Sequence, residues 1–132
     1  MKNLKGLGSK IPTPLKPDVK TLETFKTPGV DIVIFKTKEF TSLCPVTGQP
    51  DFAEVVIEYN PYDLCLESKS LKLYLQSYRN EKGFIEQLVC SICDDIVEAI
   101  NPYFVEVSME SVPRGGVALK AKKCSYRRSD EA

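Results

Sequence analysis

The apolar residues of this chain recur at every second position in some segments and at every third or fourth in others. The order of those segments restricts the fold more than any other feature of the sequence. Within residues 52–59 the apolar side chains fall on alternate positions: Ala53, Val55, Ile57 and Tyr59. Glu54 and Glu58 lie between them, so this segment predicts a half-buried strand that ends before Pro61. The β-branched run at residues 32–35 predicts an earlier strand.

Two segments in the middle of the chain have a helical period instead. In residues 68–78 the spacing i, i+3, i+4, i+7 is met by Leu71, Tyr74, Leu75 and Tyr78. In residues 84–100 one apolar stripe is formed by Ile85, Leu88, Ile92, Ile96 and Ile100. Both patterns predict helices with one face toward a core, and Asn101 with Pro102 ends the second helix.

Alternation returns near the end of the chain, at Tyr103, Val105, Val107 and Met109 and again at Val117, Leu119 and Ala121. The turn at residues 113–116 joins the two runs into a predicted β-hairpin. The order strand, strand, helix, helix, strand, strand predicts an α+β fold, with two helices on one face of an antiparallel sheet. We expect an N-terminal arm at residues 1–30, one domain at 31–123 and a polar tail at 124–132. An open sheet also leaves edge strands, which association into a closed ring would remove.

Composition excludes several classes of protein. The 132 residues include 18 basic and 18 acidic side chains, and this balance does not suggest nucleic-acid binding. The chain contains no apolar run of membrane-spanning length and no signal-peptide pattern. Its five cysteines, an odd number without a secretory signal, favour free thiols in a reducing cytoplasm.

The chain contains no histidine, so its cysteines lack the imidazole partner of cysteine proteases and acyltransferases. Catalytic zinc and non-haem iron sites also normally need imidazole ligands, and we predict no metal site. Cys90 and Cys93 have the spacing of a metal-binding pair, but they lie in the second predicted helix without a matching pair. We interpret these two cysteines as helix-packing residues.

Cys44 is the candidate nucleophile, because it lies in a turn rich in Pro and Gly, seven residues before Asp51. A turn exposes a thiol and leaves backbone N–H groups to stabilise a thiolate, and a nearby carboxyl can move a proton. A cysteine with an acid and no histidine favours covalent chemistry on an electrophilic carbon. The structural alternative is an ordinary turn cysteine. Similarly, the basic stripe formed by Lys69, Lys72 and Arg79 is either a solvated helix face or a phosphate-binding edge.

Three segments carry a resemblance to a known family: the Cys44 turn, the octapeptide at residues 67–74 (ESKSLKLY) and the PRGG turn at residues 113–116. Together they resemble the NADPH-dependent 7-cyano-7-deazaguanine reductases, the nitrile reductases of queuosine biosynthesis, a tRNA modification. The resemblance covers roughly residues 30–120. It implies the tunnelling fold, in which ββααββ subunits assemble into rings, here as stacked pentamers, with active sites between subunits.

The resemblance also implies roles for individual residues. Cys44 would add to the nitrile carbon and form a thioimide, and Asp51 would donate protons. The substrate-binding positions would be Leu66, Glu67, Ser68, Ile85 and Glu86, with Glu86 on the guanine-like edge of the base. NADPH would contact Ser68, Lys69, Arg114 and Gly115.

This sequence departs from the family pattern at one position, because Ile85 occupies the place of a histidine that usually precedes Glu86. Two other functions remain open at this stage. One is an amidinotransferase-like enzyme that uses the same thioimide without NADPH. The other is a ring protein that binds purines and catalyses nothing, in which Cys44 is idle.

Overall fold

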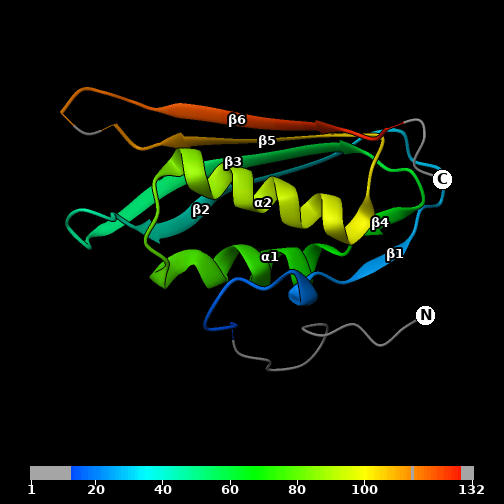
Figure 1. Cartoon of the computed structure of the whole chain (residues 1–132), viewed down its shortest axis with the longest axis horizontal. Coiled ribbons are helices and arrows are strands. Elements are labelled where there is room, and N and C mark those ends of the chain that lie inside the picture. Colours follow the sequence, from blue (N-terminus) through cyan, green and yellow to red (C-terminus); the bar gives the residue numbers. More distant parts are fainter. Residues whose placement is uncertain (1–12, 114, 129–132) are drawn as a thin grey trace.

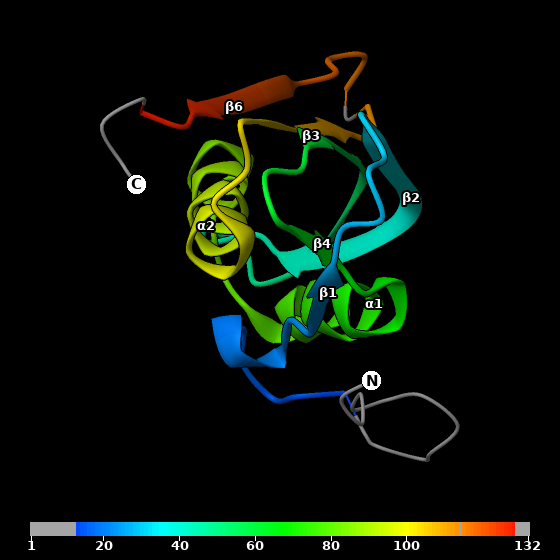
Figure 2. The same ribbon diagram turned by 90° about the vertical axis from the view of Figure 1, so that its right-hand side faces the viewer.

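The computed structural model describes residues 13–113 and 115–128 of the chain. Within these residues a four-stranded antiparallel sheet has the order β2-β3-β5-β6. Its strands are β2 (Val33–Leu43), β3 (Pro50–Asn60), β5 (Phe104–Ser111) and β6 (Lys120–Tyr126). Helices α1 (Ser68–Gln76) and α2 (Ile85–Ile100) pack on one face of this sheet (Figures 1 and 2). The predicted α+β layer is therefore confirmed.

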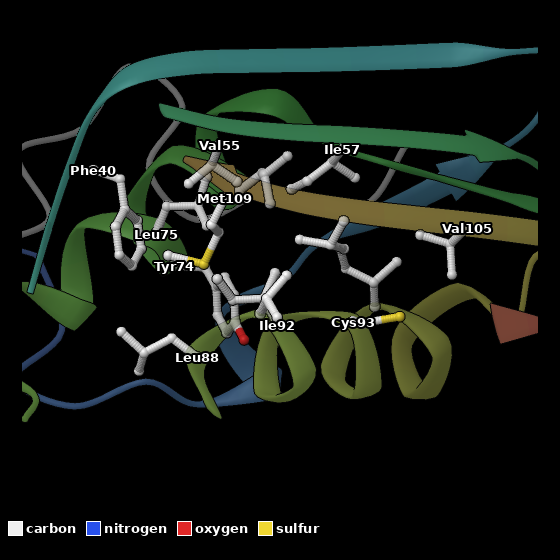
Figure 3. Packing of buried hydrophobic residues seen from close by; sticks show 14 of the residues in the cluster. Phe40, Val55, Ile57, Tyr74, Leu75, Leu88, Ile92, Cys93, Val105 and Met109 are labelled. Carbon is white, nitrogen blue, oxygen red and sulfur yellow. The ribbon is translucent and has the colours of Figure 1, made fainter. Parts of the chain in front are cut away.

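The core lies between that face and the two helices. Cross-strand pairs bring the alternating residues of β3 and β5 together, as in Val55 opposite Met109 and Ile57 opposite Val107. These four side chains are fully buried. Helix α2 packs its apolar stripe against them, and Figure 3 shows Ile92 and Cys93 pointing from α2 toward the sheet. The periods seen in the sequence therefore correspond to the buried faces of the strands and of α2.

Polar contacts link and end the two helices. The Tyr74 hydroxyl of α1 donates to the Asp95 carboxylate of α2 at 2.6 Å and lies 2.8 Å from the Tyr78 hydroxyl. Tyr78 belongs to the 3-10 helix η2 (Ser77–Asn80), which continues α1. Helix α2 ends at Asn101, whose φ of 38° lies in the left-handed region, and the following Pro102 cannot continue the helix.

Residues 19–26 are more regular than we expected of an N-terminal arm. They contain the 3-10 helix η1 (Val19–Thr21) and strand β1 (Thr24–Lys26), which pairs with β4 (Leu64–Leu66) in a separate two-stranded sheet. Leu22 is buried in the core, and the Glu23 N–H donates to the Ser70 hydroxyl at 2.9 Å. A strand of three residues is too short to show a period, which explains why neither β1 nor β4 was predicted.

The ends of two other strands also differ from expectation. Strand β2 continues past a bulge between Thr37 and Phe40 to Leu43, well beyond the predicted run at 32–35. Strand β6 begins at Lys120 and extends to Tyr126, three residues into the predicted polar tail. Val117 and Leu119, which we predicted to lie on the strand, precede it and are exposed. Cross-strand hydrogen bonding sets these limits, with β3 for β2 and with β5 for β6, and the apolar pattern does not report it.

The sheet ends in two edge strands among the described residues, β2 on one side and β6 on the other. Each of these edge strands has a row of backbone groups on the side away from its sheet neighbour. No helix in the described part of the chain is long and apolar enough to cross a membrane.

Candidate active site

Three connecting segments meet at one end of the sheet, at the left of Figure 1. They are the β2–β3 turn, the start of α2 and the connection between β5 and β6. Between them lies a cavity of about 420 Å³, which we call the thiol pocket. Its lining residues are Cys44, Pro45, Asp51, Phe52, Gly83, Phe84, Ile85, Glu86, Ser111, Val112, Pro113, Val117 and Leu119. Four predicted site residues, Cys44, Asp51, Ile85 and Glu86, thus come together.

Backbone hydrogen bonds hold the start of α2 beside Cys44. The Leu43 N–H donates to the Glu81 carbonyl at 2.9 Å, and the Gly83 N–H donates to the Leu43 carbonyl at 3.2 Å. The segment before α2 therefore runs along the last residue of β2, immediately before Cys44. A Cβ on Gly83 would lie only 2.8 Å from Leu88 Cδ2, so a side chain at this position would have to displace Leu88.

The β2–β3 turn is closed at its base by two backbone bonds. Cys44 donates its N–H to the Gln49 carbonyl at 2.8 Å, and its carbonyl accepts the Gly48 N–H at 2.8 Å. Gly48 has a φ of 74°, which a residue with a side chain rarely adopts. Asp51 pairs with Ser42 across the strands, so Asp51 is on the helix side of the sheet. The turn thereby places the thiol and the carboxyl in one cavity.

The surroundings of Cys44 favour its thiolate. Hydrogen bonds from the Thr47 side chain and from the backbone of Thr47 and Val46 lower the pKa of the thiol. Partial burial and the negative charge of Asp51 act in the opposite direction but do not cancel that effect. The Thr47 N–H lies 3.5 Å from the sulfur. A thiol with a lowered pKa in an open cavity has the character of a nucleophile.

The other four cysteines differ from Cys44. Burial raises the pKa of Cys93 to about 11, and Cys65 is also buried. Burial and a hydrogen bond to Glu106 raise the pKa of the exposed Cys124. Cys90 and Cys93 both lie in α2 and are free thiols, as are the remaining three cysteines. Cys44 is therefore the one whose setting promotes ionisation.

Ile85 and Glu86 occupy the first turn of α2. The Gln87 side chain accepts a hydrogen bond from the Phe84 N–H at 3.0 Å and so fixes the helix start. Glu86 is exposed toward the thiol pocket, and its carboxylate is favoured near the positive end of the helix. Ile85 both lines the pocket and packs against the core, so it forms part of the pocket wall.

The other predicted binding residues lie elsewhere in the single chain. Leu66 is buried, and Glu67 caps α1 by accepting the N–H groups of Lys69 and Ser70 at 2.9 and 2.7 Å. Ser68 and Lys69 line a second cavity of about 440 Å³, which we call the lysine pocket. Its lining residues are Phe35, Lys36, Thr37, Glu39, Phe40, Ser68, Lys69, Lys72, Leu75 and Gln76.

Gly115, one of the predicted cofactor contacts, has a φ of 57° and does not line either pocket. Arg114 lies outside the described residues. We did not predict the apolar wall of the thiol pocket, which is formed by Phe52, Val112, Val117 and Leu119. Phe52 could have been found, because it has the parity opposite to Ala53 and Val55 and so cannot point into the core.

The sheet, the two helices on one face and the thiol pocket at the sheet end define an α+β domain with a candidate site for covalent chemistry. A family model described as QueF-like protein matches residues 50–130. An NADPH-dependent 7-cyano-7-deazaguanine reductase of Streptococcus thermophilus is 49% identical over 123 residues, covering 90% of this chain and 76% of that protein. The reductase of the same name from Helicobacter pylori is 46% identical over 121 residues, covering 89% and 82%.

Among solved structures, an archaeosine synthase described as QueF-Like, in its apo form, matches with a TM-score of 0.69 and 29% identity. The match covers 74% of this chain and 95% of that one. The chain belongs to the family of NADPH-dependent 7-cyano-7-deazaguanine reductases. The family resemblance and the fold predicted from the sequence are both confirmed.

Proposed function

We propose that this protein reduces the nitrile of 7-cyano-7-deazaguanine to the primary amine with NADPH, as a step of queuosine biosynthesis. The observation that carries the proposal is the thiol pocket, which combines a readily ionised Cys44 with Asp51 and Glu86. Sequence identity of 49% and 46% to reductases that act on this nitrile supports the same substrate. The cavity of about 420 Å³ is within the usual range of small-molecule sites.

Cys44 begins the reaction by adding its sulfur to the nitrile carbon. One C–S bond forms, one of the two π bonds of the nitrile breaks, and the nitrogen takes up a proton to give a thioimide. Asp51 relays that proton, because its carboxylate takes the proton that the Cys44 thiol loses and passes it to the nitrogen within the same pocket. Covalent capture converts a weak electrophile into an imine-like carbon that accepts hydride.

Glu86 recognises the base. A guanine-like edge presents adjacent N–H donors, and a carboxylate accepts both in a bidentate arrangement. The exposed position of Glu86 on the first turn of α2 leaves its carboxylate available to the pocket. Ile85 contributes an apolar surface beside it, and Phe52 offers a ring for the flat heterocycle.

The lysine pocket fits the phosphates of NADPH, because Lys36, Lys69 and Lys72 line it together. NADPH supplies hydride when bound, and the four-electron change from nitrile to amine consumes two molecules of it. Ser68 and Lys69 would hold the cofactor near the start of α1. Glu67 fixes the orientation of the first turn of α1 by accepting the N–H groups of Lys69 and Ser70, and the buried Leu66 precedes it.

Assembly into a ring completes the site in this proposal. Phe40 of the lysine pocket and Cys44 of the thiol pocket are four residues apart along β2, about 13 Å at about 3.3 Å per residue. Pairing of the β2 edge of one copy with the β6 edge of the next would extend the sheet across subunits. A neighbour could then bring a second set of residues to each thiol pocket. Stacked pentamers in the cytoplasm are the form we propose.

The transferase alternative is less favoured. It rests on the archaeosine synthase structure, which is 29% identical to this chain, whereas the reductases reach 49%. The two functions differ in a simple way, because only the reductase oxidises NADPH.

The proposal is tested by incubating the protein with 7-cyano-7-deazaguanine, with and without NADPH, and following absorbance at 340 nm and intact protein mass. We expect a mass increase equal to the substrate without NADPH, and NADPH oxidation when both are present. Cys44→Ala should abolish both signals, whereas Cys124→Ala, which removes another thiol that is not buried, should abolish neither. An adduct on Cys44→Ala, or an adduct in the wild type without NADPH oxidation, would contradict the proposal.

A further inference from the structure

Thr47 provides hydrogen-bond donors to the Cys44 sulfur. It lies in the β2–β3 turn, three residues after Cys44, and the backbone bond from Gly48 to the Cys44 carbonyl folds the turn back onto the thiol. The Thr47 N–H points at the sulfur at 3.5 Å, and hydrogen bonding by the Thr47 side chain lowers the pKa of the same thiol. One residue therefore offers two donors to the same sulfur.

A third residue fixes the orientation of the Thr47 hydroxyl. The Gln49 N–H donates to Thr47 Oγ1 at 3.2 Å and occupies one lone pair of that oxygen. A threonine hydroxyl has one proton to donate, and with Gln49 acting as the donor on one side, that proton is left for the sulfur. The turn thus makes Thr47 a donor toward Cys44 rather than an acceptor from it.

The charged groups around the pocket make such donors necessary. The titratable side chains that line the thiol pocket with Cys44 are Asp51 from β3 and Glu86 from α2, and the negative charge of Asp51 disfavours the thiolate. Lys82, in the segment before α2, lines a different cavity. The chain contains no histidine. In the part of the pocket that the structure describes, the neutral donors of the turn therefore stabilise the thiolate.

We propose that Thr47 is the positioning residue that keeps the Cys44 sulfur ionised and directed into the thiol pocket. This inference rests on the proposed function, in which Cys44 is the nucleophile. Charge-assisted hydrogen bonds are stronger than neutral ones, so the Thr47 donors favour the thiolate over both the thiol and the thioether-like sulfur of the adduct. The same donors assist the later step in which the C–S bond breaks and the electron pair returns to sulfur.

The test measures the ionisation of Cys44 directly, without substrate or cofactor. The protein is alkylated with iodoacetamide over a range of pH values, and modification of the peptide that contains Cys44 is quantified by mass spectrometry. Thr47→Val keeps the shape of the side chain and removes the hydroxyl, so we expect its alkylation midpoint to move to higher pH. Thr47→Ser restores the hydroxyl and should return the midpoint toward that of the wild type. Cys124, whose peptide is measured in the same samples, is the internal standard and should not change.

Thr27→Val is the matched control variant. Thr27 makes the same kind of bond in an exposed turn, accepting the Gly29 N–H at 3.2 Å, and it lines neither the thiol pocket nor the lysine pocket. It should leave the Cys44 midpoint unchanged. An unmoved midpoint in Thr47→Val, or an equal shift in Thr47→Ser, overturns the inference. If Thr47→Val fails to fold, as judged by thermal melting, the comparison of Thr47→Ser with Thr47→Ala decides it in the same way.

A second measurement separates this inference from the proposed function. Adduct formation with 7-cyano-7-deazaguanine is followed by intact mass for the wild type and Thr47→Val at one pH below the wild-type midpoint. We expect a slower adduct in the variant and full recovery of the rate at high pH. A midpoint shift without any adduct in the wild type would refute the proposed function and leave the role of Thr47 intact. An adduct in the wild type without a midpoint shift in Thr47→Val would do the reverse.

Discussion

Replacing Ile85 with histidine tests the position at which the family resemblance predicts a histidine before Glu86. Ile85 begins α2, packs partly against the core and lines the thiol pocket. Full burial of an isoleucine side chain is worth about 1.5–3 kcal/mol, so a partly buried one contributes roughly half of that. An imidazole retains some of this contact and can point its polar edge into the open pocket. We therefore expect Ile85→His to lower the free energy of unfolding by about 1 kcal/mol, or about 4 °C in melting temperature.

The same substitution should keep or increase turnover. The imidazole adds a hydrogen-bond donor next to Glu86, and a neutral hydrogen bond is worth about 0.5–1.5 kcal/mol, which corresponds to an increase of up to roughly tenfold. Thermal melting and NADPH oxidation are measured on the same preparation. Ile92→His is the control, because Ile92 lies on the same helix and is fully buried. This variant should lose far more stability than Ile85→His. A fall in melting temperature as large as that of the control, with no gain in rate, would show that Ile85 is a core residue and refute the reasoning.

Three further predictions concern the pocket and the core. Asp51→Asn should lower turnover by about 10²–10⁴-fold, because the proton donor is lost. It should also move the alkylation midpoint of the Cys44 thiol to lower pH, because the opposing negative charge is removed. Unchanged turnover would remove Asp51 from the mechanism. Gly83→Ala should lower the free energy of unfolding by about 1–3 kcal/mol, because its Cβ would lie 2.8 Å from Leu88 Cδ2. Melting temperature and turnover should fall together. An unaltered melting curve would show that the Leu88 side chain moves aside without cost. Burial raises the pKa of Tyr59 and Tyr78 to about 12, above the ordinary value of 10.0. The stability contributed by these two buried hydroxyls is therefore fully present below about pH 10 and is lost as the pH rises toward 12. Urea midpoints between pH 9 and 12 measure this loss, and Tyr78→Phe should reduce it; midpoints that do not change over this range would contradict it.

The large elements of the fold could be predicted because their periods report which face is buried. Strand β3 shows alternation from Ala53 to Tyr59, and α2 shows a helical stripe from Leu88 to Ile100, and these are the faces that form the core. Elements without a period were missed. Strands β1 and β4 have three residues each, and pairing with one another and the burial of Leu22 hold them in place. Such pairing joins residues about 40 positions apart, which no local pattern contains.

The candidate site divides in the same way. The turn around Cys44 and the nearby Asp51 could be recognised locally, because proline, glycine and a short spacing specify the turn. The approach of Glu86 to Cys44 could not, since it depends on the hydrogen bonds between Leu43 and the segment before α2. Ser68, Lys69 and Lys72 of the octapeptide line the lysine pocket, which in the single chain is separate from the thiol pocket. Local sequence specifies which side chains can react, and only the packing of strands and helices decides which of them meet, because contacts between distant segments are formed by the buried core.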